Sequence, residues 1–231
     1  MKRIIQETED GSKTIYIEDW NESYHSKHGA VQEAMHVFIK NGFSHFITTK
    51  KPLKILEIGL GTGLNAFITL LEAEKNQQYV NYVGIEKFPV LEAEFDAIDF
   101  FDDVFKFYPE LAHRKEELHV IYRHLFLSDW ENWQIISPYF KIKKVKDDFF
   151  NLKNCNETEF DLVYFDAFGS QVQPEMWEKE LFEIIDSTTK PTAIFTTYAS
   201  KGTVKRGLKE LGYVVEKRPG PPGKREMMVG L

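Results

Sequence analysis

The sequence has few of the features that mark secreted, membrane-spanning or metal-binding proteins. It contains one cysteine, Cys155, so an internal disulfide or a metal site built from several cysteines is excluded, as suits a reducing compartment. No apolar run approaches the roughly 20 residues that cross a bilayer. Residues 1–11 are polar and acidic, unlike a secretion signal. We therefore expect a cytoplasmic protein without a membrane partner.

An overall basic excess is also lacking, because the formal net charge of the 231 residues is −7. The charge is unevenly distributed, however: residues 187–231 hold nine Lys or Arg against three Glu. A basic region on an acidic protein can hold phosphates through counterion release. A solvated helix face would have the same composition, so charge alone leaves both interpretations open.

The most informative segment is residues 53–65, Leu-Lys-Ile-Leu-Glu-Ile-Gly-Leu-Gly-Thr-Gly-Leu-Asn. Its apolar start, 53–58, predicts a buried strand, and a helical spacing of apolar residues follows from Leu64 onward. Between them lie alternating glycines, which let a nucleotide-like ligand approach the main chain closely. The segment therefore predicts a site for a nucleoside cofactor, with a purely structural turn as the alternative.

The spacing of the glycines discriminates between cofactors. The dinucleotide fingerprint Gly-x-Gly-x-x-Gly requires a small sixth residue, where this chain has Leu64. The arrangement Glu-x-Gly-x-Gly-x-Gly instead resembles motif I of class I S-adenosylmethionine-dependent methyltransferases. That cofactor has no phosphate, and its amino acid end suits carboxylates and backbone carbonyls. We assign the following residues of the motif to the cofactor site: Glu57, Gly59, Gly61, Thr62, Gly63 and Asn65.

Acidic residues follow the next predicted strands. Glu86 closes the strand 80–85, 23 residues after Gly63, where a carboxylate can accept both ribose hydroxyls. The alternative for Glu86 is a surface ion pair with Lys87, and both residues enter our predicted cofactor site. After the strand 139–145 we assign Asp148 and Phe149 to the adenine, although a core position would also suit Phe149. Asp166 follows the strand 160–165 and also enters our predicted cofactor site.

Alternating strands and helices predict an α/β, Rossmann-like, doubly wound and mostly parallel sheet of seven strands. Residues 1–45 are expected to form an N-terminal extension, with a hairpin around Asp10-Gly11 and a helix over 20–42, and residues 46–231 the methyltransferase domain. Residues 101–137 show no clear pattern beyond helix and loop. The remaining expected helices are 89–100, 178–185 and 201–211, and the remaining strands are 192–197, 213–217 and 226–229.

Sequence blocks along nearly the whole chain are similar to one family, the methyltransferase domain of MnmC. They are Tyr24-His-Ser26, Gly29-Ala30, Glu33, His36-Val-Phe-Ile39, Glu57 to Asn65, Glu86-Lys-Phe-Pro89, Asp166-Ala-Phe168, Pro174-Glu-Met-Trp177, Thr196, Gly202, Val204, Arg206-Gly207-Leu208, Gly212-Tyr213, Lys217-Arg218 and Lys224-Arg-Glu-Met227. The Glu-Lys-Phe-Pro and Lys-Arg-Glu-Met blocks are far more specific than a glycine turn.

This resemblance implies methyl transfer from S-adenosylmethionine to the amine of 5-aminomethyl-(2-thio)uridine at tRNA position 34, with the anticodon loop as partner and no metal. Bifunctional members add an FAD-dependent oxidase domain. The sequence ends at Leu231, so we expect no FAD and a separate oxidase or other enzyme that supplies the aminomethyl precursor. The family's Asp-Gly-Phe-Ala-Pro loop is Asp166-Ala-Phe-Gly-Ser170 here and lacks its proline.

Asp166 is the candidate catalytic residue, because an alkyl amine must lose a proton before it attacks. Capping of the loop backbone is an equally simple role for it. Candidate contacts to the RNA substrate are Lys201, Arg206, Arg218, Lys224 and Arg225. Two other functions fit the sequence: an aminopropyltransferase that acts on a small polyamine, and an RNA-binding module without catalysis. The basic C-terminal region favours phosphate over a polyamine, and the intact glycine turn favours an enzyme.

Overall fold

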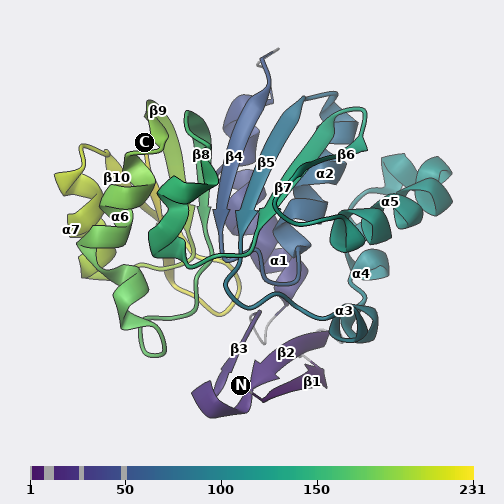
Figure 1. Cartoon of the computed structure of the whole chain (residues 1–231), viewed down its shortest axis with the longest axis horizontal. Coiled ribbons are helices and arrows are strands. Elements are labelled where there is room, and N and C mark those ends of the chain that lie inside the picture. The colour runs from purple at the N-terminus through teal and green to yellow at the C-terminus, as the bar shows by residue number, and fades with distance from the viewer. Residues whose placement is uncertain (1, 8–12, 26–28, 48–50) are drawn as a thin grey trace.

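The computed structural model describes residues 2–7, 13–25, 29–47 and 51–231, and its centre is a sheet in the order β10-β11-β9-β8-β4-β5-β7-β6 (Figure 1). The five strands from β9 to β7 run parallel, whereas β10, β11 and β6 are antiparallel to their neighbours. The strands are β4 (Leu53–Ile58), β5 (Val80–Ile85), β6 (Trp133–Ser137), β7 (Phe140–Val145), β8 (Phe160–Phe165), β9 (Thr189–Thr197), β10 (Val215–Pro219) and β11 (Glu226–Gly230).

The predicted α/β class and mostly parallel sheet are confirmed, but the strand count of seven is wrong. The additional strand is β6, which pairs antiparallel with β7 at the edge of the sheet. Its residue Ile135 is 78% exposed, so β6 lacks the alternation of buried and exposed residues that identifies a half-buried strand. The pairing of β6 is therefore tertiary rather than encoded in a local pattern.

Both faces of the sheet are covered by helices, as expected for a doubly wound fold. Alternate residues of β4 enter different cores: Leu53 and Ile55 pack with α2, whereas Leu56 and Ile58 pack with α6 and α7. The helices of the first face include α1 (Ala30–Ala34), η2 (Met35–Lys40), η3 (Phe43–Phe46), α2 (Leu64–Asn76), α4 (Phe101–Phe105) and α5 (Lys115–Leu127). Those of the second are η5 (Phe149–Cys155), η6 (Pro174–Trp177), α6 (Lys179–Asp186) and α7 (Gly202–Glu210).

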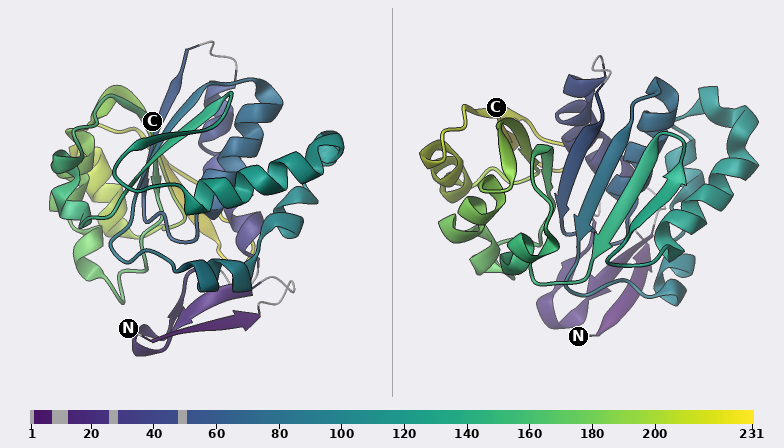
Figure 2. Two further views of the ribbon diagram at one scale, coloured as in Figure 1. Left: turned by 45° about the vertical axis from the view of Figure 1, so that its right-hand side comes forward. Right: turned by 45° about the horizontal axis from the view of Figure 1, so that its top comes forward.

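A second, three-stranded sheet is formed by β1 (Arg3–Glu7), β2 (Lys13–Ile17) and β3 (Glu22–Ser23). It lies beyond the edge at which the parallel strands end, next to α3 (Glu92–Ile98), as Figures 1 and 2 show. The strands of the expected hairpin are present, while its Asp10-Gly11 turn lies outside the described residues. The small sheet thus stands over the carboxyl edge where ligands of such folds bind.

Two expected helical regions differ from the structure. Residues 20–42 do not form one helix, because η1 (Glu18–Trp20) and β3 precede α1, and α1 continues as the π-helix η2. Within 101–137 the chain forms α4, η4 (Pro109–Arg114), α5 and β6. Among the described residues, none of the helices is both long and apolar enough to traverse a bilayer.

Candidate active site

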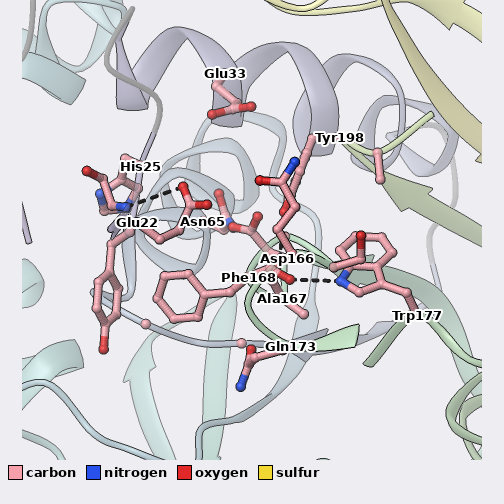
Figure 3. Close-up of a pocket in the computed structure, with 18 of the residues that line it drawn as sticks. Glu22, His25, Glu33, Asn65, Asp166, Ala167, Phe168, Gln173, Trp177 and Tyr198 are labelled. Carbon is pink, nitrogen blue, oxygen red and sulfur yellow. Dashed lines mark hydrogen bonds between the residues drawn. The ribbon is translucent and has the colours of Figure 1, made fainter. Parts of the chain in front are cut away.

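A cavity of about 760 Å³ opens at the carboxyl edge of the central sheet (Figure 3). Its walls come from the segments that directly follow four adjacent parallel strands: Gly59 after β4, Glu86 after β5, Asp166 after β8 and Tyr198 after β9. Parallel strands bring residues that are far apart in sequence to one edge, which is why the strand-end acids predicted from sequence meet here. Glu22 and Glu33 complete the wall from the N-terminal region.

The glycine turn after β4 has a backbone that side chains would disrupt. Gly59, Gly61 and Gly63 all have positive φ, at 89°, 52° and 76°. A Cβ on Gly59 would lie 2.7 Å from the Asp166 carbonyl oxygen, and one on Gly61 would lie 3.3 Å from the Tyr24 ring. Gly59, Gly61 and Thr62 line the cavity, whereas Gly63 starts helix α2 behind it. The turn therefore presents bare backbone to a ligand.

Glu86 is buried and holds this turn in place. Its Oε2 accepts from the Gly61 N–H at 3.0 Å and its Oε1 accepts from the Phe88 N–H at 2.8 Å. Burial raises the pKa of Glu86, and these backbone donors act in the opposite direction. Each oxygen keeps a lone pair that can accept a hydroxyl of a ligand in the cavity.

Glu57, expected at the cofactor, is fully buried and does not line the cavity. Its carboxylate accepts from Asn65 Nδ2 at 2.8 Å and from the Tyr82 hydroxyl at 2.8 Å. Asn65, which does line the cavity, also donates from Nδ2 to Asp166 Oδ2 at 2.9 Å. The sequence contains the signal for this position. Glu57 lies two residues after Ile55 and so shares the face of β4 that packs against helix α2. Its contact with the cavity is made through Asn65.

Asp166 lies partly exposed in the cavity, below the helix that carries Glu33 in Figure 3. Burial and the nearby Glu33 carboxylate raise the pKa of Asp166 to about 7, while the Asn65 hydrogen bond and the Lys224 ammonium oppose the shift. A carboxyl group with a pKa near neutrality can accept and release a proton under working conditions. Asp166 therefore has the properties of a general base.

The loop after Asp166 has Ser170 where the resemblance led us to expect a proline, and it is fixed by hydrogen bonds from two neighbouring aromatic residues. Trp177 Nε1 donates to the Phe168 carbonyl at 2.8 Å, drawn in Figure 3, and the Tyr198 hydroxyl donates to the Ala167 carbonyl at 2.8 Å. The Phe168 ring packs edge-on against Trp20 and Tyr24. The loop conformation thus depends on side chains that sequence reasoning did not assign to the site.

His25 is another residue that the sequence did not single out for the site. Its ring lines the cavity, with Nε2 3.1 Å from Thr62 Oγ1 and an edge-on contact with Phe100. Burial lowers the pKa of His25 to about 4, so the ring is neutral near pH 7. It links the N-terminal region to the glycine turn. Its neighbour Ser26, part of the same sequence block, lies outside the described residues.

Of the two residues expected at the adenine, Phe149 lines the cavity but Asp148 does not. Lys87, which we assigned to the cofactor site, also lines the cavity. Asp148 Oδ2 pairs with Lys87 Nζ at 2.6 Å, and its Oδ1 accepts from the Phe150 N–H at 3.1 Å at the start of η5. Asp148 thereby positions Lys87 and the Phe149 segment.

The five basic residues assigned to RNA are not all alike in position. Lys201, Lys224 and Arg225 line the cavity. Arg206 is exposed on α7, outside it. Arg218 borders a separate hollow and is engaged with Glu216 at 2.8 Å and Asn41 at 3.1 Å. The structure therefore brings three of the five together.

Within the described part of the chain, no three His, Cys, Asp or Glu side chains are grouped as metal ligands would be. The acids of the cavity contact amides, backbone N–H groups and lysines instead. As hydrogen-bond acceptors, these carboxylates suit a ligand that donates from hydroxyl and ammonium groups.

A family model described as S-adenosyl-L-methionine-dependent methyltransferase matches residues 116–231. Two curated relatives, each named tRNA 5-methylaminomethyl-2-thiouridine biosynthesis bifunctional protein MnmC, come from Leptospira borgpetersenii serovar Hardjo-bovis (strain JB197) and Marinomonas sp. (strain MWYL1). Both are 30% identical, over 91% and 96% of this chain and 32% of the relative. The chain thus spans about a third of the length of these relatives.

Solved structures share the fold. The crystal structure of MNMC2 from Aquifex aeolicus matches with a TM-score of 0.73 and 21% identity, over 99% of this chain and 70% of that one. Spermidine synthase from Thermotoga maritima matches with a TM-score of 0.57 and 12% identity, over 99% and 67%. The fold, the glycine turn with its strand-end acids and the family match over residues 116–231 agree, and the chain belongs to the family of S-adenosyl-L-methionine-dependent methyltransferases.

Proposed function

We propose that this protein transfers a methyl group from S-adenosyl-L-methionine to the primary amine of 5-aminomethyl-(2-thio)uridine at wobble position 34 of tRNA. The observation that carries the proposal is Asp166, a carboxylate with a pKa of about 7 that Asn65 holds in a cavity rimmed by Lys201, Lys224 and Arg225. The names of the MnmC relatives support the same substrate.

The cavity residues fit the cofactor. The bare backbone of Gly59 and Gly61 suits its amino acid end, and the buried Glu86 carboxylate suits the ribose hydroxyls. Phe149 would provide an apolar surface for the adenine. Glu57 and Asp148 would act through Asn65 and Lys87 rather than by direct contact. When bound, the cofactor supplies an activated methyl group on a sulfonium.

The protein has to orient an amine and remove its proton. An alkyl amine is mostly protonated at neutral pH. Asp166 would accept one proton of the ammonium and so free the lone pair of the nitrogen, to which a bound cofactor would supply its methyl group. The Asn65 amide keeps the Asp166 carboxylate in one orientation during this step. Asp166 is thus the proposed catalytic residue.

The RNA partner explains the basic rim. A uridine in an anticodon loop is unstacked and can be turned into a pocket. Lys201, Lys224 and Arg225 would contact phosphates at the cavity mouth, with Arg206 and Arg218 further along the same C-terminal region. The free aminomethyl group must be made beforehand, and we propose an oxidase or another enzyme as its source.

A second function, aminopropyl transfer to a polyamine, is favoured by the acidic side chains Glu22, Glu33 and Asp166 in one cavity. It lacks a role for the basic rim, so we rank it lower. Both reactions are measurable with the same preparation.

The test is mass spectrometry of wobble nucleosides. Bulk tRNA from a strain that lacks this methyltransferase is incubated with the protein and a methyl-labelled donor, and label is expected only in the methylaminomethyl nucleoside. A parallel reaction contains putrescine and decarboxylated S-adenosylmethionine. Label in another nucleoside, or an aminopropylated product with unlabelled tRNA, would refute the proposal.

A further inference from the structure

An ion pair that the proposed reaction does not use connects two distant parts of the cavity wall. Lys224, between β10 and β11, pairs with Glu33 on α1, and both residues line the cavity. The same lysine Nζ lies 3.7 Å from the centroid of the Tyr198 ring. An alkylammonium is therefore held between a carboxylate and an aromatic face, which is how proteins bind ligand ammonium groups.

More negative charge surrounds this position than one lysine neutralises. Glu33 raises the pKa of the Asp166 carboxyl group and Lys224 lowers it. Burial is the main cause of the raised pKa of the Tyr198 phenol, and the carboxylates of Asp166, Glu33 and Glu22 raise it further. These acids come from α1, from β3 and from the end of β8. Around Tyr198 the environment thus favours a cation.

We propose that Glu33 and Tyr198 form the subsite for the ammonium of the acceptor, and that Lys224 Nζ occupies this subsite until an RNA phosphate draws the lysine outward. The inference rests on the proposed function, since it requires an acceptor amine carried by RNA. It assigns Glu33 a positioning role next to Asp166, the proton acceptor. It also gives Lys224 two successive partners, first Glu33 and then a phosphate.

Exchange of the two cations is feasible on charge and exposure. The Lys224 side chain is 34% exposed, so it can turn towards the cavity mouth, where Arg225 also lies. Because the Lys224 side chain keeps contact with water, breaking its pair with Glu33 costs less than breaking a fully buried ion pair. The arriving ammonium restores the charge that the lysine removes, so the net charge of the subsite does not change.

The test compares two synthetic anticodon stem-loops that differ only in the wobble base, 5-aminomethyluridine or uridine. Their dissociation constants are measured by fluorescence anisotropy with S-adenosylhomocysteine present, so that no methyl group transfers. The quantity of interest is the ratio of the two constants, which isolates the contribution of the amine. Variants are Glu33→Gln and Lys224→Gln.

Lys75 and Glu110 provide matched controls. Lys75 Nζ pairs with Glu110 Oε1 at 2.6 Å and lies 5.8 Å from the centroid of Tyr108, and neither residue of the pair lines the cavity. Lys75→Gln and Glu110→Gln therefore make the same charge changes in a similar setting away from the subsite. We expect both to keep the wild-type ratio.

In Glu33→Gln the preference for the aminomethyl loop should fall about five- to tenfold, the loss of one charge-assisted contact. In Lys224→Gln the preference should rise about two- to fivefold because the competitor is gone. Both loops should bind this variant more weakly, with a salt slope lower by about 0.7.

Each result bears on the inference. Equal binding of the two loops by the wild type, or a wild-type ratio in Glu33→Gln, overturns the ammonium subsite. A wild-type ratio in Lys224→Gln overturns the role of that lysine as an occupant. If neither loop binds the wild type and wobble nucleosides remain unlabelled, the proposed function fails instead, which is a distinguishable outcome.

Discussion

Asn65 Nδ2 lies 2.9 Å from Asp166 Oδ2, and the same nitrogen lies 2.8 Å from Glu57 Oε1. The two N–H groups of one amide thus join carboxyl groups from the ends of the neighbouring strands β4 and β8. Burial raises the pKa of both acids, and the Asn65 hydrogen bond acts against each shift. Asn65 therefore fixes the orientation of Asp166 and limits how weak an acid it becomes.

The first prediction concerns the pH dependence of methyl transfer. As a base, Asp166 acts when it is deprotonated, so kcat/KM for the tRNA substrate should rise with pH and level off above about 7, the pKa of this carboxyl group. Asp166→Asn should lower kcat about 100-fold or more and remove this limb, while cofactor affinity stays nearly unchanged.

The measurements are initial rates from pH 5.5 to 9 and equilibrium dialysis with labelled cofactor. The charged groups that face Asp166 are Glu33 and Lys224, and the buried Glu57 lies beyond Asn65. Wild type and Asp166→Asn are therefore compared with these residues unchanged. Unchanged turnover in Asp166→Asn would remove the catalytic role, and lost cofactor binding would indicate a structural one.

The second prediction concerns stability. Between its ordinary pKa of 3.8 and the folded value of about 7, Asp166 keeps a proton in the folded state that the unfolded state has released. Stability from this group is therefore present at low pH and lost as the pH rises through 7. Asp166→Asn avoids the loss and should be about 1–2 kcal/mol more stable than wild type at pH 8. This gain is smaller than the whole pKa shift would give, because Asp166 is partly exposed to solvent.

Urea unfolding at pH 4 and pH 8 checks this prediction, and the two proteins should converge at pH 4. Asp102→Asn is the control, because Lys115 lowers the pKa of this exposed residue. It should show no gain at pH 8. A gain in Asp166→Asn that is the same at both pH values would contradict an origin in titration.

The parts of the fold that sequence predicted are those with a strong local pattern. The strands 53–58, 80–85 and 160–165 match β4, β5 and β8 at both ends, because each is a short apolar run that is buried on both faces. Glu86 and Asp166 could be placed at one edge because parallel strands end together. The edge strand β6 and the two-residue strand β3 depend on tertiary pairing, which leaves no such pattern.

The rest of the site depends on contacts between distant segments. Tyr198, Trp177 and Glu33 contact the loop after β8 or its cavity from three separate segments of the chain. Nothing in the local sequence of these residues specifies such contacts. For Glu57 the necessary signal was present. It lies two residues after Ile55, on the same face of β4, and this face is turned towards α2.

The third prediction tests the amide bridge. Asn65→Ala removes a donor from the buried Glu57 carboxyl group and from the partly exposed Asp166 carboxyl group, and we expect a loss of about 1–3 kcal/mol in the free energy of unfolding. Because the Asn65 hydrogen bond holds the pKa of Asp166 down, the acid limb of kcat/KM should move to higher pH. Asn76→Ala is the matched control: Asn76 lies on the same helix and donates to Glu72 Oε2 at 3.0 Å, away from the cavity. An unmoved limb in Asn65→Ala would contradict the coupling to Asp166.

The fourth prediction separates backbone strain from close contact in the glycine turn. Gly59 and Gly212 have similar φ values, 89° and 97°, but a Cβ on Gly59 would meet the Asp166 carbonyl oxygen at 2.7 Å, while one on Gly212 has no atom within 4 Å.

Gly212→Ala should therefore cost about 1–2 kcal/mol from backbone strain alone. Gly59→Ala bears the same strain and must in addition displace Asp166, so in urea unfolding it should be destabilised clearly more. Displacement of Asp166 by about 1 Å should also reduce methyl transfer by about 100-fold, whereas Gly212→Ala should retain it. Equal stability losses in the two variants, with activity kept in both, would show that the turn moves freely and that its contact with Asp166 does not determine the geometry of the site.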